Sequence, residues 1–147
     1  MNEALQREER PLRSRAGEIT VTFPGGKRVD AQVGNHRIAT DQPRVAGGED
    51  SAPAPFSLFL ASIGTCAGIY VLGFCQARGI DPGGIELTQR SVVDPETRAL
   101  RGVEIDIHVP DGFPAQYHEA LVRAASGCAV KKAIAARPEF HISVTGT

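Results

Sequence analysis

The feature that most constrains this chain is the stretch from Ser51 to Ala77, in which no side chain is acidic or basic. From Phe56 onward it predicts one helix, long and apolar enough in principle to cross a bilayer. Its prolines, glycines and serines, and the soluble-sheet pattern of the remaining chain, argue against a membrane span. A helix that is apolar on every side must be buried on every side. The sequence therefore predicts a long buried central helix.

One small domain cannot easily surround such a helix. The chain has 147 residues, a length that suits one compact domain. A symmetric second copy that covers the remaining face of the helix is the simplest solution. We therefore expect a homodimer.

Composition narrows the class of protein further. Hydrophobic residues make up 41% of the chain and charged residues 22%, with 16 basic against 17 acidic side chains. These values exclude a disordered chain and a polybasic nucleic-acid binder. Three cysteines, an odd number, favour reduced thiols and a cytoplasmic location. Residues 1–14 are charged and resemble no signal peptide, so we expect a polar arm followed by a single domain at 15–147.

Alternation of apolar and polar residues identifies the expected strands. They cover residues 19–23, 29–33, 36–40, 85–93 and 100–109, with a last strand through Phe140, Ile142 and Val144. A loop at 41–55 leads into the central helix, with Pro55 in its first turn. After the strand at 100–109 we expect a helix from Pro114, with an apolar face of Tyr117, Leu121 and Ala124 or Ala125. Because no strand–helix–strand rhythm recurs, the fold class is α+β.

The cysteines are the candidates for chemistry. Cys66 lies in the central helix among small residues that let a substrate or another backbone approach. Cys128 follows Ser-Gly and would begin a second short helix, where the helix dipole, Lys131 and Lys132 favour a thiolate. Cys75 falls on the opposite face of the central helix from Cys66 and is interpreted as core. A lone buried cysteine is usually inert, and spacing alone does not bring Cys66 and Cys128 within disulfide range.

Other kinds of site have little support in the sequence. The four histidines are scattered at His36, His108, His118 and His141, without metal-ligand spacing. Phosphate-binding loops, dinucleotide fingerprints and serine-nucleophile elbows are also lacking. We therefore expect no metal and no cofactor.

Four segments together resemble the OsmC/Ohr superfamily of thiol-dependent peroxidases. They are Gly34 to Pro43, Gly47 to Pro55, Leu58 to Cys66 and Gly127 to Val130. The resemblance extends from about Ile19 to Val144. It implies an OsmC-like α+β fold and an intertwined homodimer, with two long helices packed at its centre and active sites at the interface.

The resemblance also implies a function in defence against oxidative stress. Cys66 matches the peroxidatic cysteine, which a small organic hydroperoxide oxidises, and Cys128 matches the resolving cysteine, which forms a disulfide with it. A lipoylated protein or a small thiol would then serve as the dithiol reductant. The expected substrate pocket contains Phe56, Ser57, Phe59, Ile63 and Lys131.

The chain departs from the family pattern at two places. Many members have a glutamate at the start of the central helix that pairs with an arginine, whereas this chain has Phe56 and Ser57 there. Glu49 or Asp50 could substitute for it, and the candidate arginines are Arg13, Arg15, Arg28 and Arg37. Ala129 also replaces a common proline. Two alternatives therefore stay open: a protein that binds an apolar or thiol-reactive molecule without turnover, and a structural dimer whose cysteines are core.

Overall fold

A computed structural model describes residues 17–146, so the arm expected at residues 1–14 lies outside the described residues. The chain divides into two compact units, one ending at Leu58 and the other beginning at Phe59. Each unit is described by itself. The single domain expected at residues 15–147 stays a prediction.

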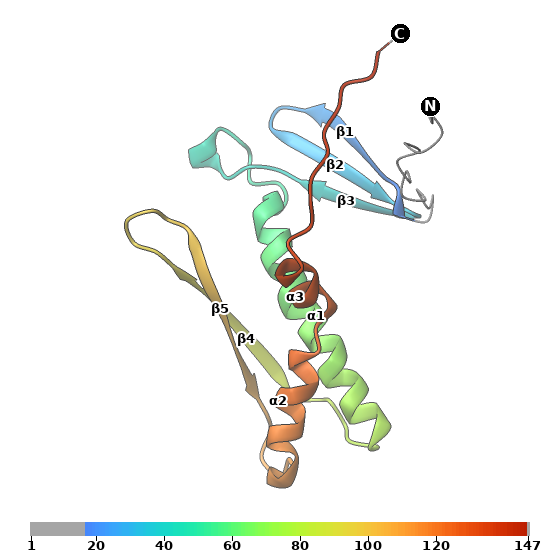
Figure 1. Ribbon diagram of the computed structural model, residues 1–147, viewed down its shortest axis with the longest axis vertical. Helices are drawn as coiled ribbons and strands as arrows, with labels where there is room; N and C mark the ends of the chain where they lie inside the picture. Colours follow the sequence, from blue (N-terminus) through green and yellow to red (C-terminus); the bar gives the residue numbers. More distant parts are fainter. Residues whose placement is uncertain (1–16, 147) are drawn as a thin grey trace, which may run out of the picture. The chain divides into compact units, whose positions relative to one another are not determined.

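The N-terminal unit contains a three-stranded antiparallel sheet in the order β1-β2-β3 (Figure 1). Its strands are β1 (Ile19–Gly25), β2 (Arg28–Val33) and β3 (His36–Thr40). The strand β1 ends at Gly25 instead of Phe23, because an irregularity after Thr22 lets it pair again where Gly25 faces Arg28. Between β2 and β3, Gly34 takes a φ of 56°, which makes the tight turn possible.

Asp41 organises the loop that follows this sheet. Its side chain is 1% exposed and accepts hydrogen bonds from the backbone N–H groups of Gln42, Glu49 and Ser51 and from the Ser51 hydroxyl. The Ser51 hydroxyl is the first cause that lowers the pKa of Asp41 to about 2. A Cβ atom on Gly48 would lie 2.0 Å from the Gln42 carbonyl oxygen, so the loop requires glycine there. The loop also contains one 3-10 turn, η2 (Arg44–Ala46).

The C-terminal unit is built on the long helix α1 (Pro55–Ala77), whose first turn still belongs to the N-terminal unit. Next along the chain come the antiparallel pair β4 (Glu86–Val93) and β5 (Leu100–His108), the 3-10 turn η3 (Ala115–Tyr117), α2 (His118–Ser126) and α3 (Ala129–Ala135). Figure 1 draws α2 beside the lower part of α1. The two helices share a core in which Val71, Phe74 and Cys75 pack with Leu121. Tyr117, Ala124 and Ala125 pack against it, as expected.

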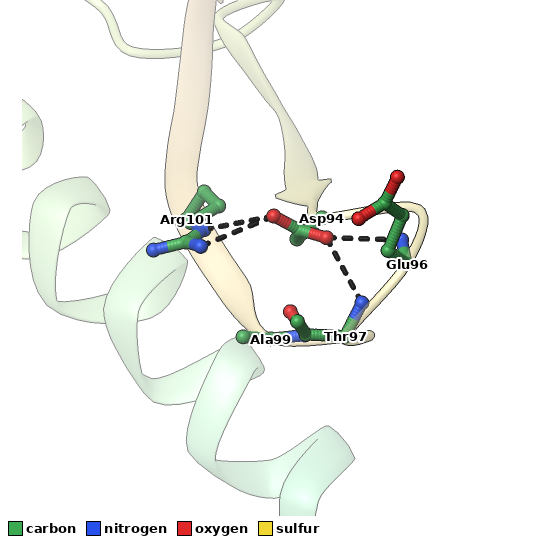
Figure 2. A network of polar contacts seen from close by, with 5 residues as sticks. All are labelled: Asp94, Glu96, Thr97, Ala99 and Arg101. Carbon is green, nitrogen blue, oxygen red and sulfur yellow. Dashed lines mark hydrogen bonds and ion pairs between the residues drawn. The ribbon is translucent and has the colours of Figure 1, made fainter.

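The turn between β4 and β5 is fixed by Asp94 (Figure 2). One of its carboxylate oxygens accepts the backbone N–H groups of Glu96 and Thr97, at 2.9 Å each, and the other accepts the guanidinium of Arg101. The Thr97 N–H is the first cause that lowers the pKa of Asp94, followed by Arg101. The carboxylate thus closes the hairpin that carries one wall of the candidate site.

Two expectations about the C-terminal unit are wrong in part. Residues 137–146 form no strand, and the side chains of Phe140, Ile142 and Val144 are 84%, 94% and 98% exposed. Alternation alone does not make a strand, because its N–H and C=O groups need a neighbouring strand, and none among the described residues pairs with this segment. The helix expected from Pro114 begins with η3 and becomes α-helical only at His118.

The central helix is covered on one side only within the single chain, so its burial on every side stays a prediction. One stripe is covered, formed by Ile63, Ala67, Val71, Phe74 and Cys75. On the other side, the side chains of Ile69 and Tyr70 are 58% and 39% exposed. By length and composition α1 could cross a membrane, a property that it shares with core helices of soluble proteins. That it does not span a bilayer stays a prediction.

Candidate functional site

Cys66 is a half-buried residue in the middle of α1. The helix can begin at Pro55, where no N–H is needed, and no proline interrupts it between Phe56 and Ala77. Gly64, which follows the buried Ile63, lets another element approach closely. A Cβ atom on Gly64 would lie 2.7 Å from the Gln89 side-chain oxygen.

Gln89 joins the hairpin to α1 at that point. Its Nε2 atom donates to the Leu60 carbonyl oxygen at 2.9 Å. Its Oε1 atom is buried without a hydrogen-bond partner among the described residues and lies against the open side of Gly64. The strand β4 is therefore held against the helix two to six residues before Cys66.

Cys128 is the N-cap of α3, as the sequence predicts. It is 2% exposed. Its sulfur accepts a hydrogen bond from the Lys131 N–H at 3.5 Å, and its S–H lies 3.9 Å (sulfur to oxygen) from the Ile63 carbonyl oxygen, to which it donates. The chain reaches this position because α2 ends at Ser126 and Gly127 caps it through the Ala124 carbonyl.

The fold brings Cys66 and Cys128 together. Three groups interact with the Cys66 sulfur and lower the pKa of its thiol, namely the backbone N–H group of Val130, the Cys128 thiol and the backbone N–H group of Ala129. Donation by Val130 is the first cause that lowers the pKa of Cys66, the Cys128 thiol is the second, and burial opposes them. All three cysteines are free thiols. The arrangement can hold Cys66 as a thiolate with a second thiol beside it.

Cys75 lies in a different environment from Cys66 and Cys128. It is fully buried in the core that α1 forms with α2. Burial raises the pKa of its thiol, with a smaller opposite contribution from Arg78. The prediction that Cys75 is a core residue is confirmed.

An apolar cavity of about 510 Å³ lies beside Cys128 in the C-terminal unit. Its walls come from α1, β5, α2 and α3. Its polar groups are Asp106, Ser126, Lys131 and the Cys128 thiol. The apolar walls are Ile63, Ala67, Val103, Ile105, Ile107, Val122, Ala125 and Ile134.

The residues expected in a substrate pocket are distributed unevenly. Ile63 and Lys131 do line the cavity. Phe59 lies in α1 with 37% of its side chain exposed and is not among the lining residues of the described chain. Phe56 and Ser57 occupy the first turn of α1, in the N-terminal unit.

The described residues that could replace the glutamate and arginine pair of the family all belong to the N-terminal unit. Arg37 forms an ion pair with the buried Asp30. Glu49 and Asp50 stand in the loop that Asp41 organises, with exposed side chains. Arg13 and Arg15 lie outside the described residues, and Arg28 lies at the start of β2. Among the described residues no group of three or more histidine, cysteine or acidic side chains could hold a metal ion.

Some contributors to the site were missed from the sequence. Ala129 and Val130 contribute their backbone N–H groups, so their side chains give no indication of this role in the sequence. The predicted helix start after Cys128 does indicate that free N–H groups lie there. Gln89 belongs to no recognisable sequence motif. The β5 wall of Val103, Ile105 and Ile107 could have been found, since these three residues alternate and share one face of the predicted strand.

Comparison with known proteins identifies the family. The profile of the family described as "OsmC-like protein" matches residues 48–143, which is more than half of the chain. The chain belongs to the OsmC-like family. No curated protein sequence matches it.

Solved structures share the OsmC-like fold. One is described as an osmotic stress induced and detoxification response protein from Psychrobacter arcticus, with 24% identity over 78% of this chain and 85% of that one and a TM-score of 0.67. Another is an OsmC-like protein from Mycoplasma pneumoniae, with 12% identity over 82% and 88% and a TM-score of 0.65. A third is an organic hydroperoxide resistance protein from Legionella pneumophila, with 22% identity over 80% and 87% and a TM-score of 0.51.

Proposed function

We propose that this OsmC-like protein is a thiol-dependent peroxidase that reduces organic hydroperoxides, with Cys66 as the peroxidatic and Cys128 as the resolving cysteine. The observation that carries the proposal is that Cys66 and Cys128 are free thiols and that the Cys128 thiol is one of the groups that lower the pKa of Cys66. The apolar cavity beside Cys128 supports an organic substrate. The family, which includes organic hydroperoxide resistance proteins, supports the reaction.

The chemistry balances in three steps. The Cys66 thiolate attacks the terminal oxygen of the hydroperoxide, the O–O bond breaks, and the alkoxide leaves as the alcohol after taking a proton. The sulfur of Cys128 then attacks the Cys66 sulfenic acid, so that an S–S bond forms and water leaves. An external dithiol, of the lipoyl or small-thiol class, reduces this disulfide and is itself oxidised.

The thiolate in this chain is stabilised without the glutamate that many relatives carry. The groups that lower the pKa of Cys66 are the Val130 N–H, the Cys128 thiol and the Ala129 N–H. We propose that these three donors stand in for the carboxylate and arginine pair in holding Cys66 charged. Orientation of the peroxide is then left to the cavity walls.

A homodimer belongs to this proposal. The exposed face of α1, with Ile69 and Tyr70, and the exposed apolar residues of the C-terminal segment are surfaces that a second copy would cover. We also propose a cytoplasmic location, where thiols stay reduced, and no nucleic-acid or membrane partner.

A turnover assay tests the peroxidase. Purified protein, cumene hydroperoxide and dihydrolipoamide are combined, and loss of peroxide is followed over time. We expect turnover with the natural protein and with Cys75→Ser, none with Cys66→Ser, and at most about one turnover with Cys128→Ser when the dithiol is omitted. Equal rates for the natural protein and Cys66→Ser would overturn the proposal.

A second function has one observation in its favour. None of the groups that lower the pKa of Cys66 is a charged side chain, while the neighbouring cavity is largely apolar. A protein that binds an apolar or thiol-reactive molecule without turnover fits both facts. It predicts no peroxide loss above the rate of Cys66→Ser, together with a ligand recovered by native mass spectrometry that Ile63→Glu abolishes.

A further inference from the structure

The sulfur of Cys128 makes contacts to two different helices. It accepts the Lys131 N–H of its own helix α3, its thiol lies near the Ile63 carbonyl of α1, and it is one of the groups that lower the pKa of Cys66. A resolving cysteine needs only the last of these contacts. The first one is a helix cap, and it is the feature that the proposed reaction has not used.

The helix α3 depends on that cap to an unusual degree. It has seven residues, none of them buried, and no acidic residue in its first turn. Short helices are marginal without packing or capping. The side chain of Cys128 supplies the N-terminal cap. The other end is closed by the backbone N–H groups of Ala136 and Arg137, and residues 137–146 form no helix or strand.

The same first turn activates Cys66. The N–H groups of Ala129 and Val130, in the first turn of α3, are among the groups that lower the pKa of Cys66, and they do so only while α3 keeps its position. Lys131 and Ile134, further along α3, form part of the cavity wall. The position of one short helix therefore decides both the thiolate and the shape of the cavity.

We propose that Cys128 is a positioning residue as well as the resolving thiol: its sulfur caps α3 in the reduced protein, and formation of the Cys66–Cys128 disulfide releases α3. The release part rests on the proposed function. On oxidation, two thiols lose their protons, the S–S bond forms, and the hydroperoxide is reduced to alcohol and water.

The geometry explains why capping and the disulfide compete. A disulfide brings the two sulfurs to about 2.05 Å, so under this proposal the Cys128 sulfur moves toward Cys66 and leaves the Lys131 N–H. A disulfide sulfur is also a poorer acceptor than a thiol that is free to turn. Release of α3 withdraws Lys131 and Ile134 from the cavity wall, which opens the disulfide to the reductant and lets the alcohol leave.

Hydrogen exchange on the full chain tests the proposal. Diamide serves as the oxidant, so that the result does not depend on peroxidase activity, and peptide mapping verifies the Cys66–Cys128 bond. We expect backbone amides of residues 131–135 to exchange about two to ten times faster in the oxidised protein, in line with the loss of one helix cap. The amides of α2 serve as the internal reference and keep their rates.

Two substitutions separate the cap from the disulfide. Serine is a good N-cap and alanine is not. Cys128→Ser should keep α3 protected with or without diamide, and Cys66 should alkylate with a pH midpoint close to that of the natural protein. Cys128→Ala should exchange like the oxidised protein while still reduced, and its Cys66 midpoint should rise. Cys66→Ser treated with diamide controls for unrelated oxidation.

Three results would overturn the proposal. The first is unchanged exchange in α3 although the disulfide has been mapped. The second is slow exchange in reduced Cys128→Ala. The third is failure of diamide to join the two cysteines, which removes the switch itself. Failure of the peroxidase alone looks different, because the diamide disulfide and the release of α3 would then persist without peroxide turnover.

Discussion

Cys66 is surrounded by donors that belong to another helix, and no charged side chain is among the groups that lower its pKa. Backbone N–H groups at a helix start stabilise a thiolate in the same way as they stabilise other anions. Among substitutions at Ala129 or Val130, only proline would remove such a donor, because every other residue keeps its backbone N–H. Changes that move α3 should therefore affect Cys66 more than changes in the side chains of Ala129 or Val130.

The lowered pKa of Cys66 predicts a pH profile. A thiol with a lowered pKa remains a thiolate at lower pH, so alkylation of Cys66 by iodoacetamide should reach half of its maximal rate below the ordinary thiol value of about 8.5. Burial raises the pKa of Cys75, so this thiol should stay unmodified until the protein unfolds. Peptide mass spectrometry against pH measures both. A Cys66 midpoint at or above that of a free cysteine would contradict the interpretation.

Asp41 predicts a stability that depends on acid. Its folded pKa of about 2 lies below the ordinary value of 3.8, so its hydrogen bonds with Ser51 stabilise the fold above about pH 4, and this stabilisation is lost as the pH falls through about 2. Asp41→Asn should lower the free energy of unfolding at neutral pH, with a difference from the natural protein that shrinks in acid. Urea unfolding at several pH values measures this difference in the free energy of unfolding. The exposed Asp111 provides the control, as Asp111→Asn.

At the scale of elements, the contact between α1 and β4 determines how the hairpin stands against the helix. Gln89 reaches the Leu60 carbonyl only because Gly64 has no side chain in the way. The strand β4 thereby supports β5, its pairing partner, at the wall of the cavity. A methyl group added at Gly64 would therefore displace the end of the Gln89 side chain.

A pair of glycine substitutions tests this contact. Gly64→Ala places a Cβ atom 2.7 Å from the Gln89 oxygen, so the end of that side chain must move away from the Leu60 carbonyl, and the loss of this hydrogen bond should cost about 0.5–1.5 kcal/mol of stability. At Gly68 no atom lies within 4 Å of the added Cβ, so Gly68→Ala should stabilise the helix by about 0.5–1 kcal/mol. Thermal unfolding compares the two. Equal effects would show that Gln89 does not hold the hairpin against α1.

The elements predicted from the sequence were those whose signals are local. The bounds of β3 (His36–Thr40) and the capping of α3 by Cys128 were predicted correctly, because turn residues and a helix start leave marks in the sequence. The C-terminal strand through Ile142 was not found, since a strand also requires a neighbour that lies elsewhere. The Asp41 loop was predicted only as a loop, because its centre is a side chain that bonds distant backbone groups.

At the scale of the whole molecule, the outer face of α1 leads to a test of assembly. Ile69 lies in the middle of α1, with 58% of its side chain exposed. If a second copy covers this face, Ile69→Glu buries an unpaired charge and should convert the dimer into monomer. Val45→Glu, at a residue that is 98% exposed in a loop, should leave the dimer intact. Light scattering after gel filtration measures the mass. A natural protein of monomer mass would contradict the dimer.

The candidate site could be predicted from the sequence only in part. Cys66 and Cys128 stand in motifs that resemble a family. Ile63 and Lys131 could be predicted as pocket residues because each lies three residues from one of these cysteines. The backbone donors of Ala129 and Val130 depend on how α3 meets α1, which spacing along the chain does not encode. The same is true of the wall that β5 contributes to the cavity.

The most direct test of the central claim is the intact mass of the protein under non-reducing conditions, before and after one equivalent of cumene hydroperoxide. The claim that Cys66 and Cys128 act as a peroxidatic and resolving pair predicts a loss of about two mass units, the two thiol hydrogens removed on oxidation. Peptide mapping should locate the bond between Cys66 and Cys128, and Cys128→Ser should instead gain one oxygen on Cys66. If both thiols stay reduced in the folded protein, the peroxidase claim is wrong.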